Sequence, residues 1–421
     1  MVLIVGGGFG GLACARALEG WPVSVHLLDS HNYHLFTPLL YQVATGLLNP
    51  SDIAHPFRSV FRGSPNVRFQ QARVELVDGP AKRVRTEAGE EIEYDYLVLA
   101  TGSTNNYFGD PDLAQFTLGM KTLEEALRLR NHVLACLERA AQSTDAAARR
   151  RELTFVVVGG GPTGVEYAGA LGELLHLVLG KEFPELDVHL ARVVLVEGQD
   201  RLLHAMAPRL GRYAARTLQR RGIEVRTGAL VSKVTRDAVT LADGQLVETA
   251  TVVWSAGVKP DLPAAASGPL KGRIEVDADF RVDDWPDAFA IGDIAAVEQD
   301  GETLPMLSAP AMQGGRHVAR LILDEVGTDA PAVARRPFRY IDKGTMATIG
   351  RNAAVGQIRR LRFTGFIGWV AWLAVHLYYL VGFRNRIVVL ATWGFNYLHR
   401  DRPIRIIARA EGDGSSGSAE V

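Results

Sequence analysis

The chain has 421 residues, too many for a single hydrophobic core, so we expect two or three domains. Hydrophobic residues make up 47% of it and charged residues 22%, as in an ordinary folded protein, and the net charge of −1 gives no general attraction to nucleic acid. Its two cysteines, Cys14 and Cys136, exclude a disulfide framework and favour a reducing, cytoplasmic compartment.

The N-terminal residues predict a strand, a glycine turn and a helix. Gly6, Gly8 and Gly11 follow a short apolar run in the G-x-G-x-x-G spacing. The first glycine allows a tight turn, the second lets a pyrophosphate approach, and the third lets the helix pack closely on the strand. A second apolar strand ends in Asp29, where the acceptor for a ribose hydroxyl is expected. We therefore predict a dinucleotide-binding fold, and a strand at this position argues against a signal peptide.

The same pattern recurs in the middle of the chain. Gly159, Gly161 and Gly164 repeat the spacing after a valine-rich strand, and a later strand ends in Glu197. A carboxylate there accepts hydrogen bonds from a free 2′-hydroxyl and repels a 2′-phosphate, which favours NADH over NADPH. Arg201 is close in sequence and argues mildly for NADPH, although a solvated surface arginine is the simpler interpretation.

Two dinucleotide folds predict two dinucleotides, with nicotinamide as the hydride donor and flavin as the acceptor. Short motifs mark the later strand ends that complete the folds: Ala100-Thr101-Gly102 and Asp293 for the first, and Ala256-Gly257 for the second. Because the first fold is completed by distant segments, we assign it to FAD. The predicted FAD domain is 1–117 with 275–325, the NADH domain is 118–274, the C-terminal region is 326–410, and 411–421 is a disordered tail.

These motifs and four further stretches resemble those of type II NADH:quinone oxidoreductases, within the flavoproteins that carry two dinucleotide-binding folds. The four stretches are His31–Tyr41, Gly161–Glu166, Lys343–Gly350 and Gly382–Arg386, and the likeness covers nearly the whole chain. The fingerprints and the resemblance together assign FAD to Gly6, Gly8, Phe9, Gly10, Gly11, Asp29, Pro38, Leu39, Val74, Ala100, Thr101, Gly102 and Asp293. They assign NADH to Gly159, Gly161, Pro162, Thr163, Gly164, Glu197, Ala256 and Gly257.

A thiol relay is missing from the sequence. Disulfide reductases of this superfamily carry a C-x₄-C pair after the first fold, whereas the corresponding stretch here, 38–44, has no cysteine. Cys14 falls on the helix behind the first glycine turn, where a small buried side chain is the better interpretation. Electrons should therefore leave the flavin directly for an external acceptor.

The C-terminal region predicts a membrane-associating surface. The segment 365–382 has 18 residues without a formal charge, which is borderline for a membrane span, and the following apolar run, 387–398, is too short. Nine arginines and one acid lie between residues 359 and 409, among tryptophans and tyrosines. This composition favours two amphipathic helices in the interface of an anionic membrane. A dimer interface and a single span are the alternatives.

The resemblance suggests candidates for the reaction with quinone. Family members usually carry an A-Q-x-A-x-Q motif near the flavin, and here Gln313 is retained while Ala309 replaces the first glutamine. This departure puts the type of quinone in doubt. Lys343 matches a lysine expected near the flavin and the quinone, where it could stabilise developing negative charge. Glu166, just inside the second phosphate-binding helix, matches a glutamate linked to quinone or NADH handling.

The sequence thus predicts an FAD-dependent enzyme that passes a hydride from NADH to FAD and two electrons to a membrane quinone, without proton pumping. We expect peripheral attachment to the cytoplasmic face of a cell inner membrane, a possible homodimer, and no metal site. A reductase for a soluble acceptor is the first alternative, and a truncation at about Leu361 should leave its activity intact. A nucleotide-binding sensor with little turnover is the second.

Overall fold

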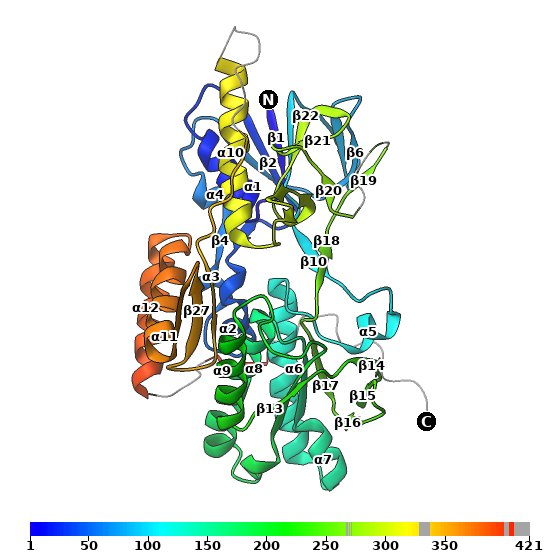
Figure 1. The fold of residues 1–421 in the computed structure, drawn as a ribbon, viewed down its shortest axis with the longest axis vertical. Coiled ribbons are helices and arrows are strands. Elements are labelled where there is room, and N and C mark those ends of the chain that lie inside the picture. Colours follow the sequence, from blue (N-terminus) through cyan, green and yellow to red (C-terminus); the bar gives the residue numbers. More distant parts are fainter. Residues whose placement is uncertain (267, 269, 271, 328–336, 400–403, 408–421) are drawn as a thin grey trace. The chain divides into compact units, whose positions relative to one another are not determined.

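The computed structural model describes residues 1–266, 268, 270, 272–327, 337–399 and 404–407. The chain forms two compact units (Figure 1). The first unit contains Met1–Leu35, Ala54–Thr104 and Val258–Lys343, and the second contains Phe36–Ile53, Asn105–Gly257 and the described part of Gly344–Val421. The predicted disordered tail, 411–421, lies outside the described residues.

The first unit is built on a six-stranded sheet in the order β21-β22-β9-β1-β2-β5. Strand β1 (Val2–Val5) pairs in parallel with β2 (Val25–Asp29) on one side and with β9 (Tyr96–Leu99) on the other. All four residues of β1 are buried, which explains why this strand is a continuous apolar run rather than an alternating one. The sheet is completed by β5 (Val67–Gln71), β21 (Arg281–Val282) and β22 (Trp285–Ala290).

Shorter elements surround this sheet. They are β3 (Tyr33–Leu35), β4 (Ala54–Pro56), α4 (Phe57–Val60), β6 (Val74–Asp78), β7 (Arg83–Thr86), β8 (Glu91–Glu93), β18 (Val258–Pro260), β19 (Ala264–Ala265), β20 (Ile274–Glu275), the 3₁₀ turn η3 (Gly292–Ile294), β23 (Ala295–Ala296), β24 (Glu298–Gln299) and β25 (Glu302–Thr303). Strand β10 (Ser103–Asn105) runs across the boundary between the two units in the sequence.

Two helices of the first unit cross at very short range. Helix α1 (Phe9–Leu18) lies against α10 (Ser308–Gly327), as Figure 1 shows. A Cβ atom at Gly315 of α10 would lie 2.3 Å from the carbonyl oxygen of Gly10 in α1. Only glycine allows this approach, so α10 holds the helix that follows the first glycine turn in place.

The second unit repeats the plan of the first. Its sheet is fully parallel, in the order β13-β12-β11-β17, with β11 (Thr154–Val158) between β12 (Arg192–Glu197) and β17 (Thr251–Trp254). Helix α8 (Pro162–Glu182) follows β11 as α1 follows β1. An antiparallel sheet of β14 (Val231–Val234), β15 (Ala238–Leu241) and β16 (Leu246–Glu248) accompanies this sheet as β6-β7-β8 accompanies the other. The internal repeat therefore extends well beyond the glycine motifs.

The remaining elements of this sheet and its helical layers have the following bounds: η1 (Thr37–Leu39), α2 (Leu40–Ala44), α3 (Pro50–Ile53), α5 (Pro111–Phe116), α6 (Leu123–Gln142), α7 (Ala146–Glu152), η2 (Val188–Leu190), α9 (Pro208–Arg220), β13 (Glu224–Thr227), β14 (Val231–Val234), β15 (Ala238–Leu241) and β16 (Leu246–Glu248). Helix α6 begins with a full capping box, in which Thr122 and Glu125 each bond the backbone N–H of the other.

The C-terminal region packs within the second unit. A three-stranded antiparallel sheet of β26 (Thr345–Thr348), β27 (Ala354–Ile358) and β28 (Leu361–Thr364) leads into α11 (Gly365–Tyr379) and α12 (Phe383–His399). Helix α11 packs on β27, and α12 contacts α3 (Figure 1). Among the described residues, no helix combines the length and the apolar character that crossing a membrane requires.

The two Rossmann-like folds and the pair of C-terminal helices agree with the predicted fold class. Helix α8 continues to Glu182, and a short helix, α7, precedes β11. The compact units also divide the chain differently from the predicted domains, since 36–53 groups with the second unit. The predicted domains were defined by the cofactor that each would bind, and that assignment stays a prediction.

The close crossing of α1 and α10 predicts a strong dependence on Gly315. We expect Gly315→Ala to lower the stability of the folded protein by about 1–3 kcal/mol, because the added methyl group collides with backbone that cannot move aside. The matched control is Gly327→Ala in the same helix, where a Cβ meets nothing within 4 Å. Thermal denaturation of both variants tests the prediction, and equal melting temperatures would contradict it.

Candidate active site

The first glycine turn leaves an open cradle in front of α1. Gly6 has φ of +101°, and a Cβ there would lie 2.4 Å from the carbonyl oxygen of Ala100. A Cβ at Gly11 would lie 1.8 Å from the carbonyl oxygen of Gly6, whereas one at Gly8 would meet nothing within 4 Å. The backbone is thus tight on the protein side and accessible on the side where a phosphate would approach.

The second glycine turn repeats this geometry. Gly159 has φ of +110°, and its Cβ would lie 2.6 Å from the carbonyl oxygen of Ser255. A Cβ at Gly164 would lie 1.8 Å from the carbonyl oxygen of Gly159, and one at Gly161 would meet nothing within 4 Å. In both folds the helix starts at a glycine without a side-chain cap and has no acid in its first turn. The N–H groups of that turn can therefore bind an anion.

The two predicted ribose acceptors are held in the same way. Asp29 accepts hydrogen bonds from the backbone N–H of Gly7 at 2.6 Å and of His31 at 2.8 Å. Glu197 accepts from Gly160 N at 2.5 Å and from Gln199 N at 2.7 Å. Each carboxylate thus ties the glycine turn to the residue two positions further along the chain. Each oxygen keeps a lone pair for a ribose hydroxyl, so both sites fit a dinucleotide.

Several other predicted FAD residues lie in the first unit. Thr101 donates to the carbonyl of Asp261, and Asp293, in η3, accepts from the hydroxyl of Ser103. Ala100 and Gly102 flank Thr101 at the end of β9, Phe9 and Gly10 begin α1, and Val74 begins β6. Pro38 and Leu39 instead lie in η1 of the second unit, and Leu39 is fully buried. A contact between these two residues and a flavin therefore stays a prediction.

The predicted NADH residues gather at one end of the second sheet. Pro162 and Thr163 begin α8 directly after the open position of the turn. Gly257, which follows Ala256 at the end of β17, has φ of +141°. The guanidinium of Arg201 donates to the carbonyl of His204 at 2.9 Å, which supports its interpretation as a structural surface residue.

Glu166 is the most unusual acid of the second unit. Its side chain is 8% exposed, and its Oε1 accepts hydrogen bonds from the backbone N–H of Thr348 and from the indole Nε1 of Trp372, both at 3.1 Å. Burial raises the pKa of the Glu166 carboxyl to about 8, although the two hydrogen bonds act in the opposite direction. Burial therefore favours the protonated form of this carboxyl, and both of these donors lie on Oε1.

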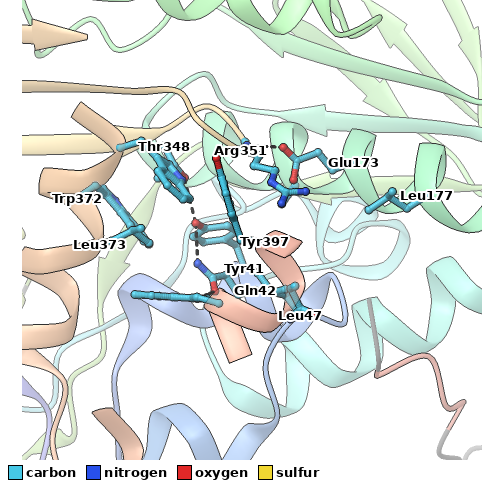
Figure 2. A pocket seen from close by; sticks show the side chains of 15 residues that line it. Tyr41, Gln42, Leu47, Glu173, Leu177, Thr348, Arg351, Trp372, Leu373 and Tyr397 are labelled. Carbon is cyan, nitrogen blue, oxygen red and sulfur yellow. Dashed lines mark hydrogen bonds between the residues drawn. The ribbon is translucent and has the colours of Figure 1, made fainter. Parts of the chain in front are cut away.

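A polar network surrounds this acid, and the sequence did not reveal it. The hydroxyls of Tyr41 and Thr348 lie 3.0 Å apart, and Gln42 Nε2 donates to the Tyr41 hydroxyl at 3.0 Å. The indole of Trp393 in α12 donates to Gln42 Oε1 at 2.8 Å (Figure 2 labels the first three residues). These partners come from α2, β26 and α12, so no local motif could have indicated them. The only available signal was the density of polar residues in otherwise apolar segments.

Comparison with known proteins decides the family. Residues 1–315 match the pyridine nucleotide-disulphide oxidoreductase family. The type II NADH:quinone oxidoreductase Ndh of Mycobacterium tuberculosis is 39% identical over 415 residues, which cover 95% of this chain and 89% of that protein. NdhA of the same organism is 41% identical over 417 residues, with 95% and 88% covered.

This chain belongs to the type II NADH:quinone oxidoreductases. The predicted family, enzyme class and electron transfer from NADH to quinone are thereby confirmed, as are the cofactors FAD and NADH. The solved structure of NDH2 from Plasmodium falciparum in complex with NADH has a TM-score of 0.88 and covers 97% of this chain and 99% of that one. Its sequence identity is 17%, so it supports the fold alone.

Thiol chemistry has no place in this member of the family. Cys14 and Cys136 are both fully buried, and burial raises the pKa of each thiol to about 12. A buried thiol with a raised pKa is a poor nucleophile, so neither cysteine is suited to attack a disulfide. The prediction that Cys14 is a packing residue is confirmed by its position in α1.

The remaining predicted residues of this oxidoreductase lie in the first unit. Gln313 in α10 exchanges two hydrogen bonds of 3.0 Å with the backbone of Ile341, one in each direction. Lys343 follows two residues later, at the end of that unit. Gln313 therefore fixes the segment that carries Lys343, which is a positioning contact that the motif alone did not predict. Their roles in quinone reduction stay predictions.

The buried acid predicts a distinctive pH dependence of stability. The pKa of Glu166 is about 8 in the folded protein and near 4.5 in the unfolded chain, so folding retains a proton that the unfolded state releases. The contribution of Glu166 to the free energy of unfolding is greatest below the unfolded-state pKa. It falls by about 1.4 kcal/mol for each pH unit between that pKa and the folded-state pKa.

Glu166→Gln removes this dependence, because the amide carries no proton to lose. Relative to the native protein, the variant should become steadily more stable as the pH rises from about 5 to about 8, and the difference should level off above that range. Glu138→Gln, which replaces an exposed acid of α6, is the matched control and should show no such trend. Urea denaturation across this pH range tests the prediction, and parallel curves for all three proteins would contradict it.

Proposed function

We propose that this oxidoreductase binds NADH at the second glycine turn, binds FAD at the first, and reduces a quinone that arrives from a lipid surface. The repeated cradle, with its matching carboxylate at the end of the second strand, is the observation that carries this proposal. When bound, FAD supplies an isoalloxazine ring that accepts a hydride equivalent and passes on two electrons. The protein residues bind, orient and protonate the reactants.

The NADH half of the reaction depends on binding and orientation. The open position at Gly161 and the free N–H groups at the start of α8 are proposed to hold the pyrophosphate, while Glu197 accepts a hydrogen bond from the ribose. Hydride transfer needs no side-chain acid or base, only close stacking of the two rings. NADH should therefore be preferred over NADPH, because Glu197 repels a 2′-phosphate.

The quinone half requires protons as well as electrons, since a quinone becomes a quinol by taking up two of each. Glu166 is proposed to supply one proton from Oε2, because burial raises the pKa of its carboxyl to about 8 and its other oxygen accepts from two donors. Lys343 is proposed to stabilise negative charge on the reduced ring, with its segment fixed by Gln313.

The C-terminal helices are proposed to attach the protein to a membrane surface. Large apolar side chains of α11 and α12 face solvent, among them Ile367, Phe383 and Leu398, which are 75%, 79% and 77% exposed. Arg384 and Arg386 lie beside Phe383 and suit anionic lipid. The cytoplasmic face of a cell inner membrane is the proposed location. The same apolar face suits a second copy of the chain, which is the competing explanation.

Membrane attachment predicts a specific loss when this face is made polar. We expect the combined variant Ile367→Ser, Phe383→Ser, Leu398→Ser to bind anionic vesicles on the order of 100-fold more weakly or worse, because each large side chain contributes about 1.5–3 kcal/mol on burial. Its oxidation of NADH with the soluble acceptor ferricyanide should be unchanged.

The matched control is Leu230→Ser with Leu246→Ser, which removes exposed leucines of the same unit outside α11 and α12. Vesicle co-sedimentation and analytical ultracentrifugation are measured together. Unchanged vesicle binding by the triple variant, with a shift from dimer to monomer, would assign the face to a second copy instead.

The coenzyme preference predicts the effect of replacing the acid at the end of β12. Glu197→Ser should raise KM for NADH about tenfold and narrow the preference for NADH over NADPH, because a charged hydrogen bond and a repulsion are both removed. Asp200→Ser, which changes a neighbouring exposed acid, should alter neither value. Steady-state rates with both coenzymes test this, and an unchanged ratio of kcat/KM values would contradict it.

A further inference from the structure

A pocket opens in the second unit between α8, α11, α12 and α2 (Figure 2). Its walls are aromatic, with Trp369 and Trp372 from α11 and Trp393 and Tyr397 from α12. The rings of Trp369 and Tyr397 lie 5.6 Å apart and are tilted by 30°, and those of Trp372 and Trp393 lie 6.0 Å apart. Flat apolar walls of this kind favour a planar ring as the occupant.

One wall residue lacks the hydrogen bonds that its burial requires. Asn396 in α12 is 7% exposed and lines the pocket, yet neither Oδ1 nor Nδ2 has a partner among the residues that the structure describes. Other buried amides nearby are satisfied: Gln42 bonds Trp393 and Tyr41, and Asn385 donates to the carbonyl of Ser51. A buried amide without partners is costly, so a polar group that enters the pocket would gain by bonding it.

The charges of the lining argue for a neutral occupant. Glu173 and Arg351 are its charged members, one of each sign. Glu173 forms an ion pair of 2.6 Å with Arg221, and the guanidinium of Arg351 lies 4.4 Å from the ring centre of Tyr397. Among the lining residues themselves the two charges balance, which favours a neutral ring over a phosphate. A bare acyl chain would fill the apolar walls but would leave Asn396 without a partner.

We propose that this pocket binds the ring of a quinone, with the Asn396 amide hydrogen bonded to a ring oxygen. Nδ2 donates to a quinone carbonyl, and Oδ1 accepts from a quinol hydroxyl, so one side chain fits the ring in both redox states. The proposal rests on the proposed quinone activity, and it adds a binding site whose residues differ from Gln313 and Lys343.

The pocket shares a residue with the buried acid. Trp372 forms part of its wall and donates the 3.1 Å hydrogen bond to Glu166, and its ring stacks on that of His376 with ring centres 3.8 Å apart. A ring in the pocket therefore contacts a direct hydrogen-bond partner of the proposed proton donor. Occupancy of the pocket and the environment of Glu166 are linked by this one indole.

The first test locates the ring directly. The full-length FAD-loaded enzyme is irradiated with a short-tailed azidoquinone, and labelled peptides are mapped by mass spectrometry. Labelling is expected on α11 and α12 around Trp393 and Asn396, and excess decylubiquinone should prevent it. Displacement of the label by phosphatidylglycerol, but not by decylubiquinone, would overturn the proposal in favour of a lipid site.

The second test compares two buried asparagines of α12. Asn396→Leu should raise KM for decylubiquinone about 3- to 10-fold, and it should be no less stable than the native protein because it removes an unsatisfied amide. Asn385→Leu, the matched control, loses the bond to Ser51 and should be less stable while its KM for quinone stays the same. Rates of NADH oxidation with ferricyanide should be equal in both variants.

The outcomes separate this inference from the proposed function. If the native protein reduces decylubiquinone but labelling falls outside the pocket and Asn396→Leu has an unchanged KM, the ring site is wrong and the quinone activity stands. If the native protein oxidises NADH with ferricyanide but never reduces quinone, the proposed function itself fails.

Discussion

The close approach of a helix to a turn carbonyl governs both nucleotide folds. The third glycine of each fingerprint lies so near the carbonyl of the first that even a methyl group is excluded. Because of this contact, the first turn of the helix points toward the open side of the glycine turn, where the second glycine leaves space. The carboxylate at the end of the next strand then bonds the turn from the opposite side. The chain meets this constraint twice with the same solution.

A second constraint links the second nucleotide fold to the C-terminal region. Helix α8 begins at the glycine turn and carries Glu166 one turn later. The same helix therefore starts at the proposed coenzyme site and bonds β26 and α11 through Glu166. Burying a carboxyl among apolar side chains is unfavourable unless it is protonated or hydrogen bonded. Here burial raises the pKa of the Glu166 carboxyl and two donors bond its Oε1, so the protonated form is favoured, as the proposed role of proton donor requires.

The sequence predicted what is local and missed what is distant. Each set of glycine spacing, apolar strands and strand-ending acid lies within some forty residues of the sequence. These patterns indicated both folds correctly. By contrast, Tyr41 meets Thr348 across 307 positions and Trp372 meets Glu166 across 206. No periodicity connects such residues, and Asn396 is indistinguishable in sequence from a solvated asparagine. Gln313 was predicted from its motif, but its bonds to Ile341 became evident only from the folded chain.

Helices α11 and α12 are bonded to the rest of the second unit through their inner faces. A truncation that removes them therefore also removes part of the packing of that unit. Trp372 bonds Glu166 in α8, Trp393 bonds Gln42 in α2, and Asn385 bonds Ser51 in α3. A chain cut near Leu361 would lose all three anchors and expose the apolar interior of the unit to water. Inactivity of such a fragment would record structural damage as much as detachment from lipid. The two helices are therefore part of the packed second unit, and their exposed side chains can be replaced without removing any of these three bonds.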